Sequence, residues 1–148
     1  MIVIDTSVLI DALHRKQAAL RKILELEETG ETLCTTQINV LELYKGVYNP
    51  TRSEKGLEKV KKLLDALVIL DINEDVYEMF GELSSELKRR GEAIGDFDEL
   101  IASIALTHEA SVVSTDSHFS QVPGLTVITP HVSSVKGRFA LRMTKFRA

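Results

Sequence analysis

Short apolar runs alternate along this chain with longer segments of helical pattern, and this alternation restricts the fold more than any other feature. The runs are rich in β-branched residues and too short for helices, which predicts buried strands. They lie at residues 2–4, 33–35, 67–70, 112–114 and 125–128. Strands that alternate with helices form a parallel sheet whose crossover helices cover both faces. We therefore expect an α/β fold, a three-layer α/β/α sandwich around a central parallel sheet.

The segments between these runs repeat apolar residues at helical spacing and carry signals for helix ends. Asn73 is a favourable N-cap, Gly91 is a favourable stop, and Pro50 disfavours helix at the residue before it. The expected helices span residues 8–14, 16–29, 38–49, 53–64, 73–90 and 100–108. The last of these is apolar on most faces, so we expect it to be buried.

The composition fits one globular domain. The 148 residues are 44% hydrophobic with a mean hydropathy of +0.02, which is enough to form a core. We expect this domain to occupy residues 1–130, followed by a basic C-terminal extension, residues 131–148, that is not a separate domain. No apolar stretch approaches the roughly 20 residues of a membrane span, and the first residues lack the features of a signal peptide. We therefore expect a cytoplasmic protein that has no membrane association.

Charge is distributed unevenly along the chain. The formal net charge is −4, and all 22 acidic residues lie at or before Asp116. Residues 117–148 carry five basic residues and no acidic one. This basic tail is able to contact phosphates, although an exposed, solvated segment is an equally good explanation. Other basic candidates for phosphate contacts are Arg15, Lys45 and Arg52.

Four carboxylates lie at the joints between the apolar runs and the helices: Asp5, Glu42, Asp98 and Asp116. Ligands of a parallel sheet bind beyond the carboxyl ends of its strands, and Asp5 and Asp116 both follow a predicted strand. Clustered carboxylates repel one another unless a cation neutralises them, and Mg²⁺ and Mn²⁺ prefer oxygen ligands. The pattern predicts an acidic metal site suited to phosphotransfer or nuclease chemistry.

Each of these four carboxylates also has a simpler structural explanation. Asp5 and Asp98 have the positions of helix N-caps, Glu42 that of a surface charge, and Asp116 that of a turn residue. Convergence of all four on one edge of the sheet is what would separate a site from four unrelated side chains.

The four carboxylates belong to short motifs whose order and spacing resemble a known family. The motifs are Asp5-Thr6-Ser7, Glu42-Leu43, Asp98-Glu99-Leu100-Ile101-Ala102 and Ser114-Thr115-Asp116-Ser117-His118-Phe119. Together they resemble the successive motifs of PIN-domain ribonucleases, specifically the VapC-type toxins of toxin–antitoxin pairs. The resemblance covers residues 1 to about 130.

The resemblance implies a catalytic, metal-binding quartet of Asp5, Glu42, Asp98 and Asp116, with Thr6 or Ser7 supporting Asp5 through a hydroxyl. Asp96 lies two residues before Asp98, and by the same resemblance it either assists the metal or caps the helix. His118 is the only histidine near a motif, and we expect it to be a turn or helix-capping residue rather than a catalytic one.

The resemblance also implies the reaction and the partners. One or two Mg²⁺ or Mn²⁺ ions would activate water for hydrolysis of RNA, leaving a 3′-hydroxyl and a 5′-phosphate. The substrate would be a structured RNA, commonly transfer or ribosomal RNA. The chain would form a homodimer and would be inhibited by a VapB-like antitoxin, which often inserts a basic side chain among the carboxylates.

Other functions share parts of this pattern. A haloacid-dehalogenase-like phosphatase or a receiver domain also has an aspartate after the first strand, but the second acid that each requires there is absent from Asp5-Thr6-Ser7-Val8. A housekeeping PIN-domain nuclease in RNA processing and a catalytically inactive PIN-like RNA-binding module remain as alternatives. Four intact acids argue against the inactive module.

Overall fold

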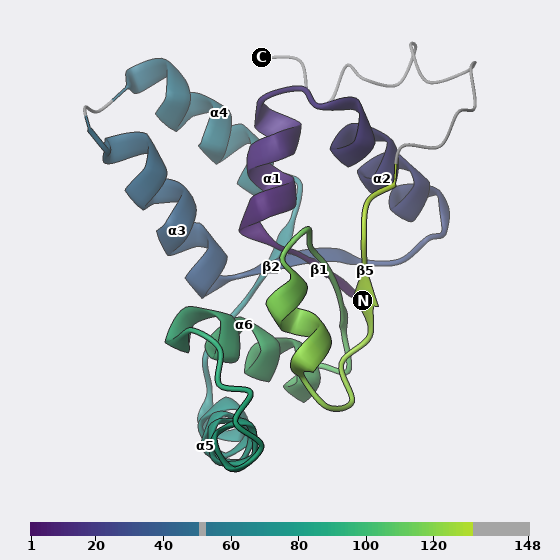
Figure 1. Ribbon diagram of the computed structural model, residues 1–148. Helices are drawn as coiled ribbons and strands as arrows, with labels where there is room; N and C mark the ends of the chain where they lie inside the picture. Colours follow the sequence, from purple (N-terminus) through teal and green to yellow (C-terminus); the bar gives the residue numbers. More distant parts are fainter. Residues whose placement is uncertain (51–52, 132–148) are drawn as a thin grey trace.

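A parallel sheet forms the centre of the molecule. The computed structural model describes residues 1–50 and 53–131. Its sheet has five strands in the order β3-β2-β1-β4-β5, and all neighbouring strands are parallel (Figure 1). The strands are β1 (Ile2–Ile4), β2 (Leu33–Thr36), β3 (Val68–Leu70), β4 (Ser111–Val113) and β5 (Val127–Ile128). Each lies on one of the predicted apolar runs, so the predicted parallel sheet is confirmed.

Helices cover both faces of this sheet (Figure 1). Within the described residues they are α1 (Thr6–Leu13), α2 (Gln17–Glu28), α3 (Gln37–Tyr48), α4 (Glu54–Asp65), α5 (Glu74–Arg89), α6 (Asp96–Thr107) and the 3₁₀ helix η1 (Ser117–Gln121). The first four contribute to the core on one face, and α5, α6 and η1 to the core on the other. The predicted three-layer α/β/α sandwich is confirmed. None of these described helices is both long enough and apolar enough to cross a bilayer.

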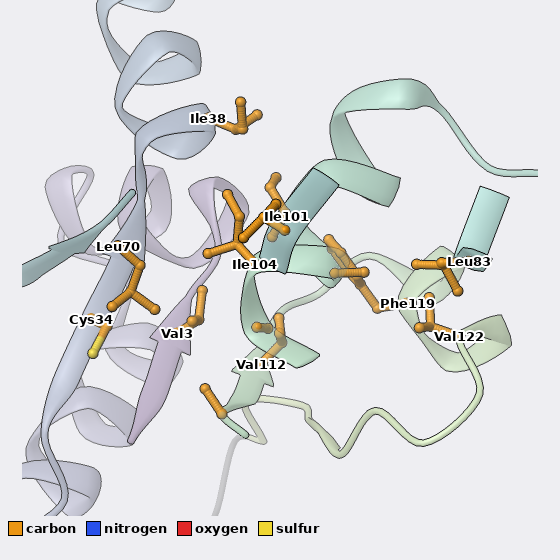
Figure 2. Packing of buried hydrophobic residues seen from close by; sticks show 14 of the residues in the cluster. Val3, Cys34, Ile38, Leu70, Leu83, Ile101, Ile104, Val112, Phe119 and Val122 are labelled. Carbon is orange, nitrogen blue, oxygen red and sulfur yellow. The ribbon is translucent and has the colours of Figure 1, made fainter. Parts of the chain in front are cut away.

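Side chains of the central strands alternate between the two cores. In β1 and β4, Val3 and Val112 point to the core formed with α5 and α6, and Ile4 and Val113 point to the opposite core. This alternation follows from the two-residue period of a strand. Figure 2 shows the first core, in which the fully buried Phe119 of η1 packs near Leu83 and Val122.

Two helices begin earlier in the sequence than predicted. α1 begins at Thr6 rather than at residue 8, because the extended Asp5 already accepts hydrogen bonds from Val8 and Leu9 through its carbonyl. α6 begins at Asp96 rather than at residue 100, and Gly95 is its N-cap. Acidic residues fill the first turn of α6, where the helix dipole favours negative charge. The predicted starts were based on the apolar periodicity, which begins after the first residues of each helix and therefore indicated only the buried part.

The topology brings the ends of several segments to one edge of the sheet. The chain runs from β1 to β2 to β3 in one direction and then crosses to β4 and β5 on the other side of β1. The strand order therefore reverses between β1 and β4, and ligands bind at such a reversal beyond the carboxyl ends of the strands. α1 and α3 begin at this edge, and α6 begins there too because it runs back to the start of β4.

Candidate metal centre

Asp5 lies between β1 and α1 and is the most deeply buried of the four predicted carboxylates, with 5% of its surface exposed. Its backbone occupies the N-cap position of α1, but its side chain makes no capping hydrogen bond. Instead, Oδ2 accepts hydrogen bonds from Ser114 Oγ at 2.7 Å and Ser7 Oγ at 3.0 Å, and Oδ1 accepts one from Asn39 Nδ2 at 3.1 Å. Three neutral donors thus hold the carboxylate in one orientation. Its hydrogen bonds go to this network and not to the backbone of α1, so Asp5 is not a simple helix cap.

Asn39 connects Asp5 to the rest of the site, and it was not among the residues predicted from the sequence. This fully buried side chain donates from Nδ2 to Asp5 and to Thr6 Oγ1, the latter at 2.9 Å. Its Oδ1 accepts from the backbone N–H and the hydroxyl of Thr36, at 3.1 and 2.7 Å. The signal in the sequence was the spacing Thr36-x-x-Asn39, a capping box at the start of α3. All four hydrogen-bonding positions of the amide are satisfied, so its orientation is fixed.

Glu42 lies on α3, where Thr6 Oγ1 donates a hydrogen bond to its Oε1 at 2.8 Å. The structure therefore places the Ser7 hydroxyl on Asp5 and the Thr6 hydroxyl on Glu42. Burial raises the pKa of Glu42, and the charges of Asp5 and Asp98 raise it further, while the Thr6 hydrogen bond opposes the shift. Glu42 is thus a half-buried member of an acidic cluster rather than an isolated surface charge.

Asp98 and Asp116 meet at the start of η1, together with His118. One ligand atom from each of these three residues lies within 4.8 Å of the others. His118 Nδ1 is 3.1 Å from Asp116 Oδ1 and 3.7 Å from Asp98 Oδ2. Asp116 Oδ1 also accepts the backbone N–H of His118 at 2.9 Å, so Asp116 caps η1 as well as facing the site. From the sequence, His118 was expected only as a turn or capping residue, and its nearness to Asp116 was the one signal of a place in the cluster.

The charges of the cluster act on Asp98 in particular. Burial raises the pKa of Asp98, and the neighbouring charges of Asp116 and Asp5 raise it further, while His118 lowers it. Among the described residues, His118 is the only side chain that can carry a positive charge within 4.0 Å of any of the four carboxylates. The cluster therefore carries an excess of negative charge.

The structure brings all four predicted carboxylates to one edge of the sheet, in two adjacent halves. Asp5 and Glu42 share the hydrogen-bond network of Thr6 and Asn39, whereas Asp98 and Asp116 share His118. The two halves interact through charge, because Asp5 raises the pKa of Asp98 and Asp98 raises the pKa of Glu42.

Asp96 and the basic candidates lie outside this cluster. Asp96 is exposed in the first turn of α6 and does not belong to the group formed by Asp98, Asp116 and His118. Lys45, one turn beyond Glu42 on α3, lowers the pKa of that carboxyl through its charge. Arg15 follows the far end of α1, away from this edge. Arg52 and the basic residues of the C-terminal extension lie outside the described residues.

This donor set fits a divalent cation. Carboxylate oxygens from two helices and two strand ends converge, burial and mutual repulsion raise the pKa of Glu42 and Asp98, and hydrogen bonds orient Asp5 and Glu42. A hard divalent cation would relieve the repulsion and satisfy the oxygens. Fold and site together define a parallel α/β protein with a carboxylate site for a cation at the reversal of its strand order.

Comparison with known proteins assigns the chain within this class. A family model described as the PIN domain matches residues 2–125. This chain belongs to the PIN-domain family. Ribonuclease VapC2 of Rickettsia felis is 30% identical over 123 residues, which are 82% of this chain and 92% of that protein. The tRNA(fMet)-specific endonuclease VapC of Shigella flexneri is 26% identical over 123 residues, with the same coverage of 82% and 92%.

Solved structures give the same result. The VapBC2 complex of Rickettsia felis, bound to a DNA fragment from its promoter, superimposes with a TM-score of 0.81 at 27% identity, covering 87% of this chain and 98% of that one. The DNA-bound VapBC complex of Salmonella typhimurium gives a TM-score of 0.78 at 25% identity, covering 86% and 96%. The resemblance to PIN-domain ribonucleases of the VapC type is confirmed.

The raised pKa values lead to a prediction about stability. The pKa values of Glu42 and Asp98 lie above their ordinary values of 4.5 and 3.8, so the metal-free protein loses stability as pH rises through the raised values. A bound cation removes this repulsion. Thermal unfolding should show that Mn²⁺ or Mg²⁺ stabilises the protein at pH 7, by about 2.7 kcal/mol at a hundredfold excess over Kd. The stabilisation should be smaller at pH 5, where protons compete for the carboxylates.

Asp98→Asn tests the origin of this effect. The variant removes one of the repelling charges, so without metal it should be more stable than the wild type at pH 7. It should also gain less from added Mn²⁺. An unchanged response to Mn²⁺ would show that the stabilising ion binds elsewhere.

The position of Asn39 leads to a second prediction. Asn39→Ala removes a buried hydrogen-bond partner from each of Asp5, Thr6 and Thr36, so urea unfolding should show a loss of roughly 1–3 kcal/mol or more. Asp5 also loses one of the three donors that orient it, the one on Oδ1, so Mn²⁺ affinity should fall by about 10- to 100-fold. Asn73→Ala is a matched control, because it removes the N-cap of α5 and should cost about 1 kcal/mol without changing Mn²⁺ affinity. Equal Mn²⁺ affinities in the two variants would contradict the role given to Asn39.

Proposed function

We propose that this chain is the toxin of a VapBC-type toxin–antitoxin pair, an endoribonuclease that hydrolyses RNA phosphodiester bonds with Mg²⁺ or Mn²⁺. The observation that carries the proposal is the convergence of Asp5, Glu42, Asp98 and Asp116 at the reversal of strand order. The family supports it, since similar proteins are named ribonucleases. An RNA-cleaving toxin of this kind would act in the cytoplasm, where its substrate is.

The four carboxylates would hold the cation. When bound, it neutralises charge on the scissile phosphate and makes water a better nucleophile. Asp5 would be oriented before the cation binds, because Ser7, Ser114 and Asn39 donate hydrogen bonds to both of its oxygens. Fixing a ligand beforehand lowers the cost of organising the site during the reaction. Asp96, exposed at the start of α6, would act from the rim of the site.

The substrate we propose is a structured RNA. One relative is named a tRNA(fMet)-specific endonuclease. Lys45 is exposed on α3 close to Glu42, so its ammonium group is placed to contact a phosphate beside the acidic cluster. A basic group next to the carboxylates offsets the repulsion between this acidic surface and a polyanion.

The partners we propose are a VapB-like antitoxin and a second copy of the chain. An apolar groove of about 440 Å³ lies between α1, α3 and α4, lined by Ile10, Leu43, Val47 and Val60 among others. The two superimposed structures are VapBC complexes, and this groove suits an apolar segment of a VapB-like antitoxin. Val68 and Ile69, on opposite faces of the edge strand β3, are 49% and 40% exposed, so the open edge of the sheet is the place we propose for a second copy.

Loss of one carboxylate tests the enzymatic proposal. Asp5→Asn or Asp98→Asn should lower RNA cleavage in Mn²⁺ or Mg²⁺ by at least about 100-fold, which corresponds to roughly 2.7 kcal/mol in the barrier. The fold should persist, because the Ser7 and Ser114 hydroxyls can reorient around Asn. Cleavage of labelled transfer RNA measures the effect, and Asp65→Asn at the exposed end of α4 is the control. Undiminished cleavage by both variants, or cleavage that survives EDTA, would refute the proposal.

The genomic neighbourhood distinguishes a toxin from a housekeeping nuclease. An antitoxin gene normally accompanies its toxin gene, so we expect a short reading frame for a small DNA-binding protein directly upstream. Its product, when co-expressed, should bind this chain and suppress RNA cleavage in the assay above. If no such frame exists, the housekeeping nuclease becomes the better explanation of the same site.

A further inference from the structure

His118 adds a nitrogen donor to a site whose other candidate ligands are all carboxylates. Its imidazole lies at the start of η1, with Nδ1 at 3.1 Å from Asp116 Oδ1 and 3.7 Å from Asp98 Oδ2. Nδ1 and one oxygen from each aspartate lie within 4.8 Å of one another. Ligand atoms that share one ion at about 2.0–2.6 Å lie within roughly 5 Å of each other, so this spacing suits a single cation.

The position of His118 is fixed by its neighbours. The next residue, Phe119, is fully buried and packs in the core with α5 and α6, as Figure 2 shows. The backbone N–H of His118 donates to Asp116 Oδ1 at 2.9 Å. These contacts hold η1 against the site although the His118 side chain itself is 56% exposed. A surface histidine with no role would not need its ring nitrogen turned toward two carboxylates.

We propose that His118 is a nitrogen ligand of the cation, through Nδ1, and that it gives this site a preference for Mn²⁺ over Mg²⁺. The inference rests on the proposed function, because it concerns the same metal site. Both ions prefer oxygen ligands, but Mg²⁺ demands near-ideal octahedral geometry and gives up its waters reluctantly, whereas Mn²⁺, a first-row transition ion, accepts an imidazole nitrogen more readily. A site of carboxylates alone would discriminate less between the two ions.

A different role for His118 gives the opposite result. If the imidazole were a charged ion-pair partner that occupies the place of the cation, metal would have to displace it. Removing it would then strengthen metal binding. The sign of the change in Mn²⁺ affinity therefore separates a ligand from a competitor.

The experiment measures metal binding to the full chain. Pulsed EPR of bound Mn²⁺ detects the magnetic coupling of a directly coordinated imidazole nitrogen, and titration gives the affinities for Mn²⁺ and Mg²⁺. The wild type should show the nitrogen coupling. His118→Ala should lose it and bind Mn²⁺ at least about 10-fold more weakly, since even residues that only orient a ligand are worth 10- to 100-fold. The loss for Mg²⁺ should be smaller.

Two further variants make the test specific. His118→Asn places an amide oxygen near the position of Nδ1, so it should retain most Mg²⁺ affinity while losing the nitrogen coupling and the Mn²⁺ preference. His14→Asn changes an exposed histidine at the end of α1 and should keep both. Circular dichroism checks that each variant is folded.

The outcomes distinguish this inference from the proposed function. Mn²⁺ binding without nitrogen coupling, or unchanged or tighter binding by His118→Ala, would overturn the role of His118 and leave the carboxylate site intact. Failure of the wild-type chain to bind Mn²⁺ at all would overturn both proposals.

Discussion

The buried carboxylate of Asp5 is the constraint around which this molecule is organised. A charge with 5% of its surface exposed is costly unless hydrogen bonds replace water, and here three neutral donors do so. They come from the start of α1, from α3 and from the end of β4, so three segments must be placed correctly for one side chain to be satisfied. Asn39 extends the same network to Thr6 and hence to Glu42. The network that makes Asp5 tolerable in the folded state therefore also builds the site.

Topology makes this convergence possible. Because the strand order reverses between β1 and β4, the segments after these two strands diverge and leave space at the edge. The first turns of α1, α3 and α6 surround that space, and their positive dipole ends partly offset the negative charge collected there. The two hydrophobic cores on either face hold these helix starts in place. Packing energy from the cores thus supports a cluster whose own charges repel.

The sequence predicted the sheet and the carboxylates, and the resemblance implied a Thr6 or Ser7 hydroxyl beside Asp5, but the partners distant in the chain were not predicted. Residues such as Val112 and Val113 identify a strand through local composition, and Asp5 or Asp116 is placed by directly following one. Partner choice is not local: Asn39 lies 34 positions from Asp5, and Ser114 lies 109 positions from it. His118 was missed because η1 has only five residues, too few to show a period, so nothing in the pattern indicated which way its ring faces. The acidic residues can be recognised in the sequence by their residue type, whereas their neutral hydrogen-bond partners can be identified only once the fold is known.

The same excess of charge would let one site serve both the proposed catalysis and its inhibition. Glu42 and Asp98 have raised pKa values because burial and their neighbours oppose ionisation, so anything that delivers positive charge to the cluster is stabilised there. A divalent cation does this during the proposed reaction. The guanidinium of an arginine from a bound antitoxin would do it equally well, through charge-assisted hydrogen bonds to the same oxygens. Inhibition would then need no separate regulatory site, because the charge that would attract the cation would also attract its competitor.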